Sequence, residues 1–135
     1  MENSNMRAWG LTILRVVVGI VFLAHGSQKL FTFGFHGVAG MFAHFGIPLP
    51  SVSAVVVTLV EFFGGLALIF GAATRFAAAL IAIDMAVAIL LVHAKNGFFA
   101  PTGFEFPLTL LAANLCLLLA GAGMLSVDGF FSRKL

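Results

Sequence analysis

The sequence has few charged residues, no tyrosine and a single cysteine. Only 9% of its 135 residues are Asp, Glu, Lys or Arg, whereas 61% are hydrophobic. This composition is typical of an integral membrane protein and differs from that of a soluble domain. The lone Cys116 excludes an intrachain disulfide and a two-cysteine thiol relay within this chain, and we expect it to be a small core residue.

The basic residues form no cluster that would indicate nucleic-acid binding, because the seven of them are spread along the chain. The apolar stretches are too long and unbroken for the alternating strands of a β-barrel. Helices must then satisfy the backbone hydrogen bonds inside lipid. We therefore predict an all-α integral membrane four-helix bundle, organised as a single domain over residues 1–135.

Four apolar segments are long enough to span a bilayer, at about residues 8–31, 52–71, 76–94 and 105–124. The first resembles a secretory signal superficially, but it is longer than the apolar region of a signal peptide and contains Arg15, so we expect it to be retained. The short segment 71–75 predicts a tight turn between antiparallel second and third spans. Between the first two spans, Val38, Met41 and Phe42 recur at helical spacing, which predicts an interfacial helix in the first outer loop.

The distribution of basic residues predicts the orientation. Four spans place one group of basic residues beside both termini, namely Arg7, Arg75, Arg133 and Lys134, and leave only Lys29 and Lys95 on the other side. By the positive-inside rule, both termini are cytoplasmic.

Three ionisable residues lie deep within the apolar segments: Arg15, Glu61 and Asp84. Such residues normally face a bundle interior and mark a functional site. Each lies about 10 to 16 Å from the cytoplasmic end of its span, at about 1.5 Å per residue, so the three could meet. Because a lone buried charge is costly, we predict a buried charge network or proton relay in which Arg15 pairs with Glu61, Asp84 or both.

A second group of polar and aromatic residues lies at the outer ends of the spans. The first and third spans run in the same direction, so their polar ends emerge on one side of the membrane. We predict that these ends, together with the following loop and the start of the fourth span, form the mouth of a ligand pocket: His25, Lys29, His93, Lys95, Phe98, Phe99 and Glu105. The alternative is an interfacial belt, with Lys29 reaching toward the membrane surface.

No metal site is predicted. The loop histidines His36 and His44 are eight residues apart and form no closely spaced ligand pair.

Several motifs, in order along nearly the whole chain, resemble those of the DoxX family. They are R-x3-G-x2-F-x2-HG-x2-KLF at residues 15–31, E-x2-GG-x2-L at residues 61–68 and TRFAAAL at residues 74–80. Later blocks around residues 93–105 and 121–128 are also similar, with Ala122 standing where the family often has proline.

The resemblance implies a small four-helix protein of the bacterial cytoplasmic (inner) membrane. It is similar to the DoxD-like subunit of thiosulfate:quinone oxidoreductase and to membrane partners of thiol-redox and superoxide-detoxifying enzymes. Many members are described only in general terms as oxidoreductases. The family's motif positions present here are Arg15, His25, Gly26, Lys29, Glu61, Gly64, Gly65, Arg75, His93 and Glu105.

One functional hypothesis is a quinone-handling or membrane-anchoring subunit of a redox or oxidative-stress complex. A Phe-lined pocket would hold the ring, while His25, Lys29 or His93 bond its carbonyls and Glu61 or Asp84 relay protons. The chain carries no flavin or nicotinamide fingerprint and no cysteine cluster, so a soluble or membrane redox partner would supply the electrons. On this hypothesis the chain is not a complete enzyme alone.

The alternative is a non-catalytic membrane scaffold or small-ligand binding module, in which Arg15, Glu61 and Asp84 form a structural network. A b-type haem held by His25 and His93 is a less favoured cofactor. The sequence is also compatible with a homo-oligomer, and the bilayer is the one partner that the composition requires.

Overall fold

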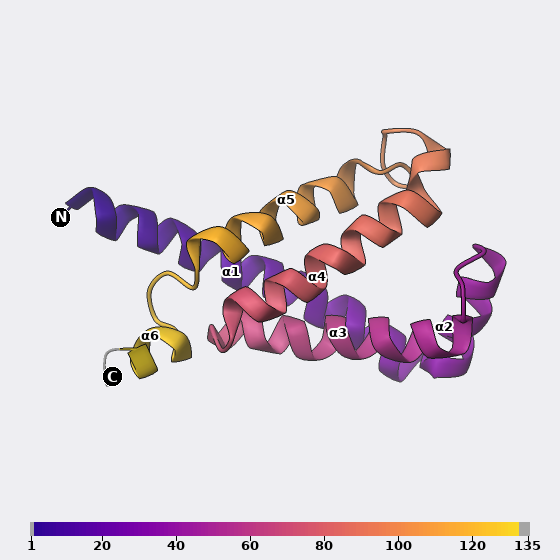
Figure 1. The fold of residues 1–135 in the computed structure, drawn as a ribbon, viewed down its shortest axis with the longest axis horizontal. Coiled ribbons are helices and arrows are strands. Elements are labelled where there is room, and N and C mark those ends of the chain that lie inside the picture. The colour runs from indigo at the N-terminus through magenta and orange to yellow at the C-terminus, as the bar shows by residue number, and fades with distance from the viewer. Residues whose placement is uncertain (1, 133–135) are drawn as a thin grey trace.

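The structure is a computed structural model that describes residues 2–132, and over this range all of its regular elements are helical. The predicted all-α class is confirmed. Arg133 and Lys134, which entered the predicted charge distribution, lie outside the described residues. The elements are α1 (Glu2–Ser27), η1 (Gln28–Phe33), α2 (Gly34–His44), α3 (Pro50–Phe70), α4 (Thr74–Ala88), η2 (Ile89–His93), η3 (Ala94–Asn96), α5 (Glu105–Ala120) and α6 (Val127–Ser132) (Figure 1).

The helix predicted for the first loop is present as α2. The π-helical segment η1 continues α1, and the chain changes direction at Gly34, whose φ of 71° suits a residue without a Cβ atom. Helix α2 then packs on the first turns of α3, where Val38, Phe42 and Ala54 form a buried apolar cluster. The α2 segment thereby covers one end of α3.

Helices α3 and α4 form the predicted antiparallel hairpin. Helix α3 ends at Gly71, a left-handed C-cap with a φ of 69°. The Asp128 carboxylate, from α6, accepts hydrogen bonds from the backbone amides of Ala73 and Thr74 at 2.6 and 2.8 Å. This side chain caps the start of α4 and ties α6 to the turn.

Glycines allow α1 and α3 to pack closely along their length. A Cβ atom added at Gly26 would collide with the backbone of Phe62, and one added at Gly65 would collide with the backbone of Leu23. Small residues at such positions let helix backbones approach each other in membranes. Helix α4 instead packs mainly on α5, and α3 and α4 diverge with distance from their shared turn (Figure 1).

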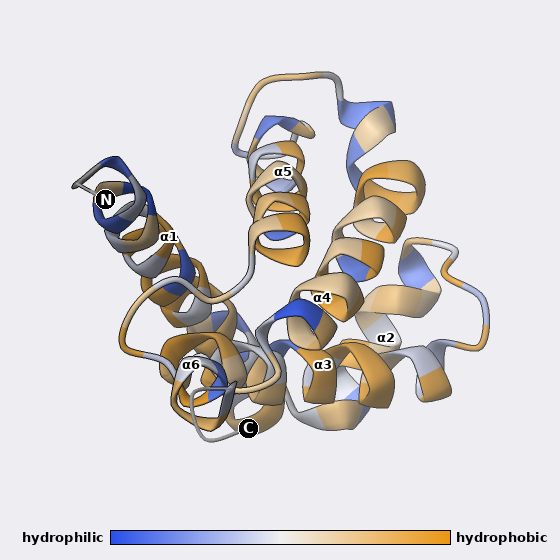
Figure 2. Ribbon diagram, turned by 60° about the vertical axis from the view of Figure 1, so that its left-hand side comes forward, coloured by the Kyte–Doolittle hydropathy of each residue, from blue (hydrophilic) through white to orange (hydrophobic). Residues whose placement is uncertain are grey.

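Three helical segments are long and apolar enough to cross a membrane: Asn3–His44, Pro50–Phe70 and Thr74–Asn96. The fourth, Glu105–Ala120, is shorter. It ends before the expected boundary at residue 124 because Gly121 and Gly123 have φ values of 87° and 75°. Apolar residues dominate α3, α4 and α5 (Figure 2), and many of their apolar side chains are exposed, as expected for contact with lipid. Cys116 lies on an exposed face of α5, so the expectation that it is a core residue was wrong.

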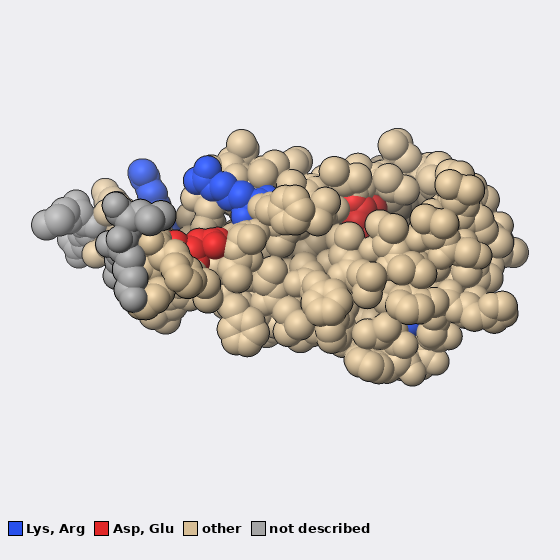
Figure 3. All heavy atoms as spheres, turned by 60° about the horizontal axis from the view of Figure 1, so that its bottom comes forward, with Lys and Arg blue, Asp and Glu red and all other residues tan. Residues whose placement is uncertain are grey.

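The two ends of the bundle differ in charge. Helix α6 lies at the end where α1 begins, and Arg7, Arg75 and Asp128 line one cavity there. Most of the charged side chains visible in Figure 3 gather at this end, and the rest of the visible surface carries only one acidic patch and a small basic spot. The described part of the chain therefore keeps the two arginines assigned to the terminal side together.

Candidate functional site

A cavity of about 650 Å³ lies where α3 and α4 diverge. Helices α1 and α2 and the start of α5 complete its wall, and most of the lining is apolar, including Phe22, Val57, Met85 and Leu110. Five ionisable residues also line the cavity: His25, Lys29, Glu61, Asp84 and His93. The structure thus joins the inner carboxylates and part of the predicted outer mouth in one site.

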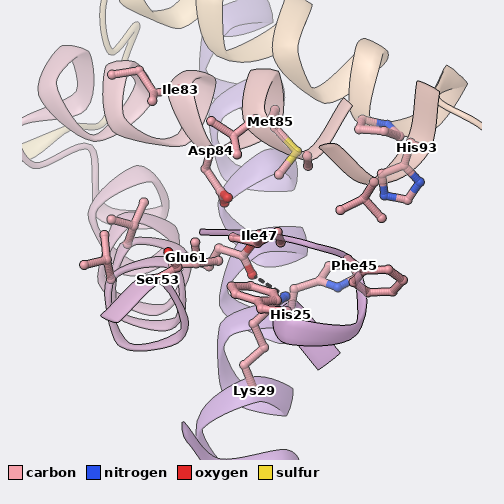
Figure 4. Close-up of a pocket in the computed structure, with 18 of the residues that line it drawn as sticks. His25, Lys29, Phe45, Ile47, Ser53, Glu61, Ile83, Asp84, Met85 and His93 are labelled. Carbon is pink, nitrogen blue, oxygen red and sulfur yellow. Dashed lines mark hydrogen bonds and ion pairs between the residues drawn. The ribbon is translucent and has the colours of Figure 1, made fainter. Parts of the chain in front are cut away.

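The centre of the site is an ion cluster formed by Lys29, Glu61 and Asp84. Lys29 Nζ lies 2.8 Å from Glu61 Oε2, and the two side chains are 17% and 5% exposed. Asp84 points from α4 across the cavity toward Glu61 (Figure 4). Its Oδ2 atom is buried and has no hydrogen-bond partner. Lys29 therefore pairs with Glu61, and Asp84 adds a second carboxyl group beside this pair, with one oxygen that has no hydrogen-bond partner.

Two π-helical segments border the cavity. Segment η1 carries Lys29 and segment η2 carries His93. A π turn contains more residues than an α turn, so it changes the direction in which the following side chains point. Such turns are rare and are found frequently at functional sites. Their presence directly after both α1 and α4, at the same cavity, supports a functional role for this region.

The two histidines line the cavity from different helices. His25 lies one turn before Lys29 and is exposed. His93 Nδ1 lies 3.0 Å from the carbonyl oxygen of Thr102. A carbonyl oxygen only accepts hydrogen bonds, so Nδ1 is the donor in this contact and Nε2 is the other ring nitrogen that can bind a ligand.

The remaining residues of the predicted mouth do not line the cavity. Lys95 Nζ lies 5.8 Å from the ring centre of Phe45, a cation–π contact with a residue of the cavity wall. Phe98 packs on Phe99, and Glu105 accepts a hydrogen bond from the amide of Ala100 at 3.0 Å. These contacts belong to a compact turn, from which only Pro101 contributes to the cavity.

Arg15 is not part of the ion cluster, so the predicted pairing with Glu61 or Asp84 was wrong. Its guanidinium is buried, with the residue 1% exposed, and donates to the carbonyl oxygens of Ala122, Met124 and Leu125. The register of α1 against α3 explains this, because Gly26 lies against Glu61 and Phe62 while Arg15 lies against Gly71. Residues 15 and 26 are about 16 Å apart along α1, at about 1.5 Å per residue.

Lys29 reaches inward to Glu61 and not outward to the membrane surface, so the interfacial interpretation of this residue was wrong. The sequence-based prediction also missed the apolar wall. Val57 and Val60 lie within one turn of Glu61, and Val87 and Ala88 lie within about one turn of Asp84. Their position on the carboxylate-bearing faces was the available signal.

Within residues 2–132, no group of three or more His, Cys, Asp or Glu side chains is arranged to hold a metal ion. The groups that could hold an organic ligand are the apolar walls, Lys29, the two histidines and Asp84 Oδ2.

Comparisons with known proteins identify the family. The DoxX family model matches residues 10–94. A Bacillus subtilis protein named "Putative oxidoreductase CatD" is 37% identical over 90% of this chain and 86% of its own length. An uncharacterized protein of Haemophilus influenzae is 33% identical over 99% of this chain and its own full length. An uncharacterized membrane protein of Mycobacterium tuberculosis is also 33% identical, over 90% of this chain and 80% of its own length.

No solved structure gives a significant match to the chain. The family match extends from α1 to the end of η2 and includes all the ionisable residues of the cavity. Together with the apolar helices, it shows that the chain belongs to the DoxX family and is a membrane protein.

Proposed function

We propose that this protein binds a quinone in the α3–α4 cavity and acts as the quinone-handling subunit of a membrane redox complex. The observation that carries the proposal is the Lys29, Glu61 and Asp84 cluster in the wall of an otherwise apolar cavity. A quinone ring needs an apolar slot with a few polar groups directed at its two carbonyl oxygens. The cavity volume of about 650 Å³ is also within the usual range for small-molecule sites.

Each polar group has a role in this reaction. Quinone reduction consumes two electrons and two protons and gives a quinol. Lys29 and a histidine can donate hydrogen bonds to the ring oxygens, and a carboxylic acid at Asp84 or Glu61 can deliver protons to them. Asp84 is the better placed carboxyl group because its Oδ2 atom has no protein partner.

The electrons would come from a partner protein. The fold supplies binding, orientation and proton transfer to the quinone, whereas the electron donor would be a second redox protein. The name of the Bacillus subtilis relative supports an oxidoreductase assignment in general terms. An anchoring role for the same chain, without chemistry at the cavity, is the competing proposal.

Quinone binding can be measured with purified protein in detergent. We expect a quinone with one isoprene unit to bind to the wild-type protein and to raise its melting temperature. His25→Ala and His93→Ala should each weaken binding about tenfold, the equivalent of about 1.4 kcal/mol for one lost hydrogen bond. Binding is read by equilibrium dialysis with chromatographic detection of the quinone.

Glu105→Gln is the matched control, because Glu105 belongs to the compact turn and does not line the cavity. It should bind the quinone as the wild type does. Absence of quinone binding to the wild-type protein would overturn the proposal. A haem between His25 and His93 would instead give the same preparation a haem absorption spectrum.

We also propose that the protein lies in the bacterial cytoplasmic membrane with both termini in the cytoplasm. The support is the position of Arg7 and Arg75 at one end of the bundle. A cysteine at Phe99, which is exposed at the other end, should react with a membrane-impermeant thiol reagent from outside the cell. The measurement uses a background without Cys116, and labelling only after lysis would contradict this orientation.

A further inference from the structure

We infer that the cavity receives its ligand sideways from the hydrocarbon, through the gap between α3 and α4, and that the ligand is a quinone carrying a long isoprenoid tail. This inference rests on the proposed quinone function and specifies how the ligand enters. The tail would stay in the gap while the ring reaches the ion cluster.

The rim of the cavity carries the first evidence. Val56 on α3 and Ile83 on α4 both line the cavity, yet they are 53% and 62% exposed. Val52 and Val87 share this combination one turn along each helix. Residues that both line a cavity and face outward mark the place where it opens. By this criterion the cavity opens between the two helices, and also near His25, Met41, Pro101 and Phe106, which line it and are exposed.

The depth and chemistry of the rim indicate what passes through it. Ile83 is close to the middle of the apolar segment Thr74–Asn96, and Val56 lies about 9 Å inside the start of α3, at about 1.5 Å per residue. The four rim residues are all aliphatic. An opening of this kind inside a membrane span faces acyl chains and not water, so it favours a ligand dissolved in the bilayer.

The outer end of the site is crossed by side chains. Lys95 at the end of the α4 segment contacts the ring of Phe45, which follows α2, and His93 is tied to the Thr102 carbonyl. These contacts connect the end of the α4 segment to the residue that follows α2 and to the loop before α5. A route from water at this end would pass these polar contacts, whereas a route past Val56 and Ile83 meets aliphatic side chains.

The polarity of the cavity matches a molecule with a polar head and an apolar tail. Glu61 is almost completely buried, and Asp84 Oδ2 is buried without a partner, whereas the rim is exposed and aliphatic. A tailed quinone satisfies both ends, because its ring oxygens need hydrogen bonds and its tail needs hydrocarbon. A short, water-soluble quinone would use only the inner half.

Blocking the gap tests the inference. In lipid nanodiscs, Ile83→Trp should weaken binding of a long-tailed quinone at least tenfold, while affinity for the one-unit quinone changes less than threefold. Val56→Trp, from the opposite side of the gap, should give the same result and serves if the first variant does not fold. Leu90→Trp is the matched control on the same helical segment, because Leu90 is 75% exposed and does not line the cavity.

Equal losses for both quinones, or no loss for the tailed one, would overturn the lateral route while leaving the proposed function intact. Failure of both quinones to bind the wild-type protein would overturn the proposed function. A second measurement tests the lateral route without using a quinone. With Trp9 replaced by Phe, a tryptophan at Val57 should be quenched by lipids brominated on their acyl chains, and quenching only by aqueous iodide would contradict lateral opening.

Discussion

Replacing Lys29 with methionine is expected to lower the free energy of unfolding by about 3 to 5 kcal/mol. The substitution leaves Glu61, which is 5% exposed, without the ammonium group 2.8 Å away and beside a second carboxyl group on Asp84. Removing one member of a buried ion pair costs more than the pair contributes, because the remaining charge stays desolvated. Reversible unfolding in mixed detergent micelles measures the loss.

The double variant Lys29→Met, Glu61→Gln should recover most of that stability. A glutamine amide at position 61 can donate a hydrogen bond to Asp84, so the site again contains a satisfied polar pair. Lys95→Met is the matched control, because Lys95 is exposed and its ammonium group lies over the face of Phe45, and it should cost less than about 1 kcal/mol. Additive losses from the Lys29 and Glu61 substitutions would show that the two residues are not coupled.

Replacing Arg15 with methionine is expected to release the C-terminal segment from the bundle and to cost about 3 to 5 kcal/mol. Arg15 donates to three carbonyl oxygens, those of Ala122, Met124 and Leu125. The substitution removes the charged donor from these carbonyl groups, of which that of Met124 keeps a hydrogen bond from the Thr12 hydroxyl. Hydrogen bonds to charged groups contribute about 1.5 to 3 kcal/mol each without adding fully. Limited proteolysis should then cleave the chain after α5, where the wild-type protein resists.

The Arg15→Lys substitution tests whether the positive charge is sufficient or whether the planar geometry of the guanidinium donors is also needed. A lysine keeps the positive charge, but its single ammonium group does not reproduce the planar set of donors, so an intermediate loss is expected. Arg7→Met is the control, because Arg7 is exposed at the same end of α1. Continued protection of the C-terminal segment in Arg15→Met would contradict the role assigned to this arginine.

The helical class and the approximate helix positions could be predicted because they depend on local hydrophobicity and on the glycines and prolines that interrupt the apolar segments. Four long apolar stretches leave few alternatives once the chain is in lipid. The inner carboxylates Glu61 and Asp84 could be recognised for a related reason, since a buried ionisable group is costly wherever it occurs.

The partner of Glu61 could not be predicted, because it depends on the register between two helices. That register is set by the contacts of Gly26 and Gly65 with the facing backbone, which the sequence does not specify. The π turn at residues 28–33 adds a change in side-chain direction that hydrophobic periodicity does not reveal. Lys29 therefore holds the place beside Glu61 that was expected for Arg15.

The turn between α3 and α4 sets the angle at which the two helices diverge. Gly71 and Ala73 have positive φ values, and Asp128 holds the amides of residues 73 and 74. Ile83 lies about 14 Å and His93 about 28 Å along the helix from Thr74, at about 1.5 Å per residue. A rotation of α4 by about 5° about this turn would therefore move Ile83 by about 1 Å and His93 by about 2.5 Å over these lengths. The aperture of the site therefore depends on the angle between α3 and α4, and a carboxylate at the opposite end of the molecule holds the turn between these helices.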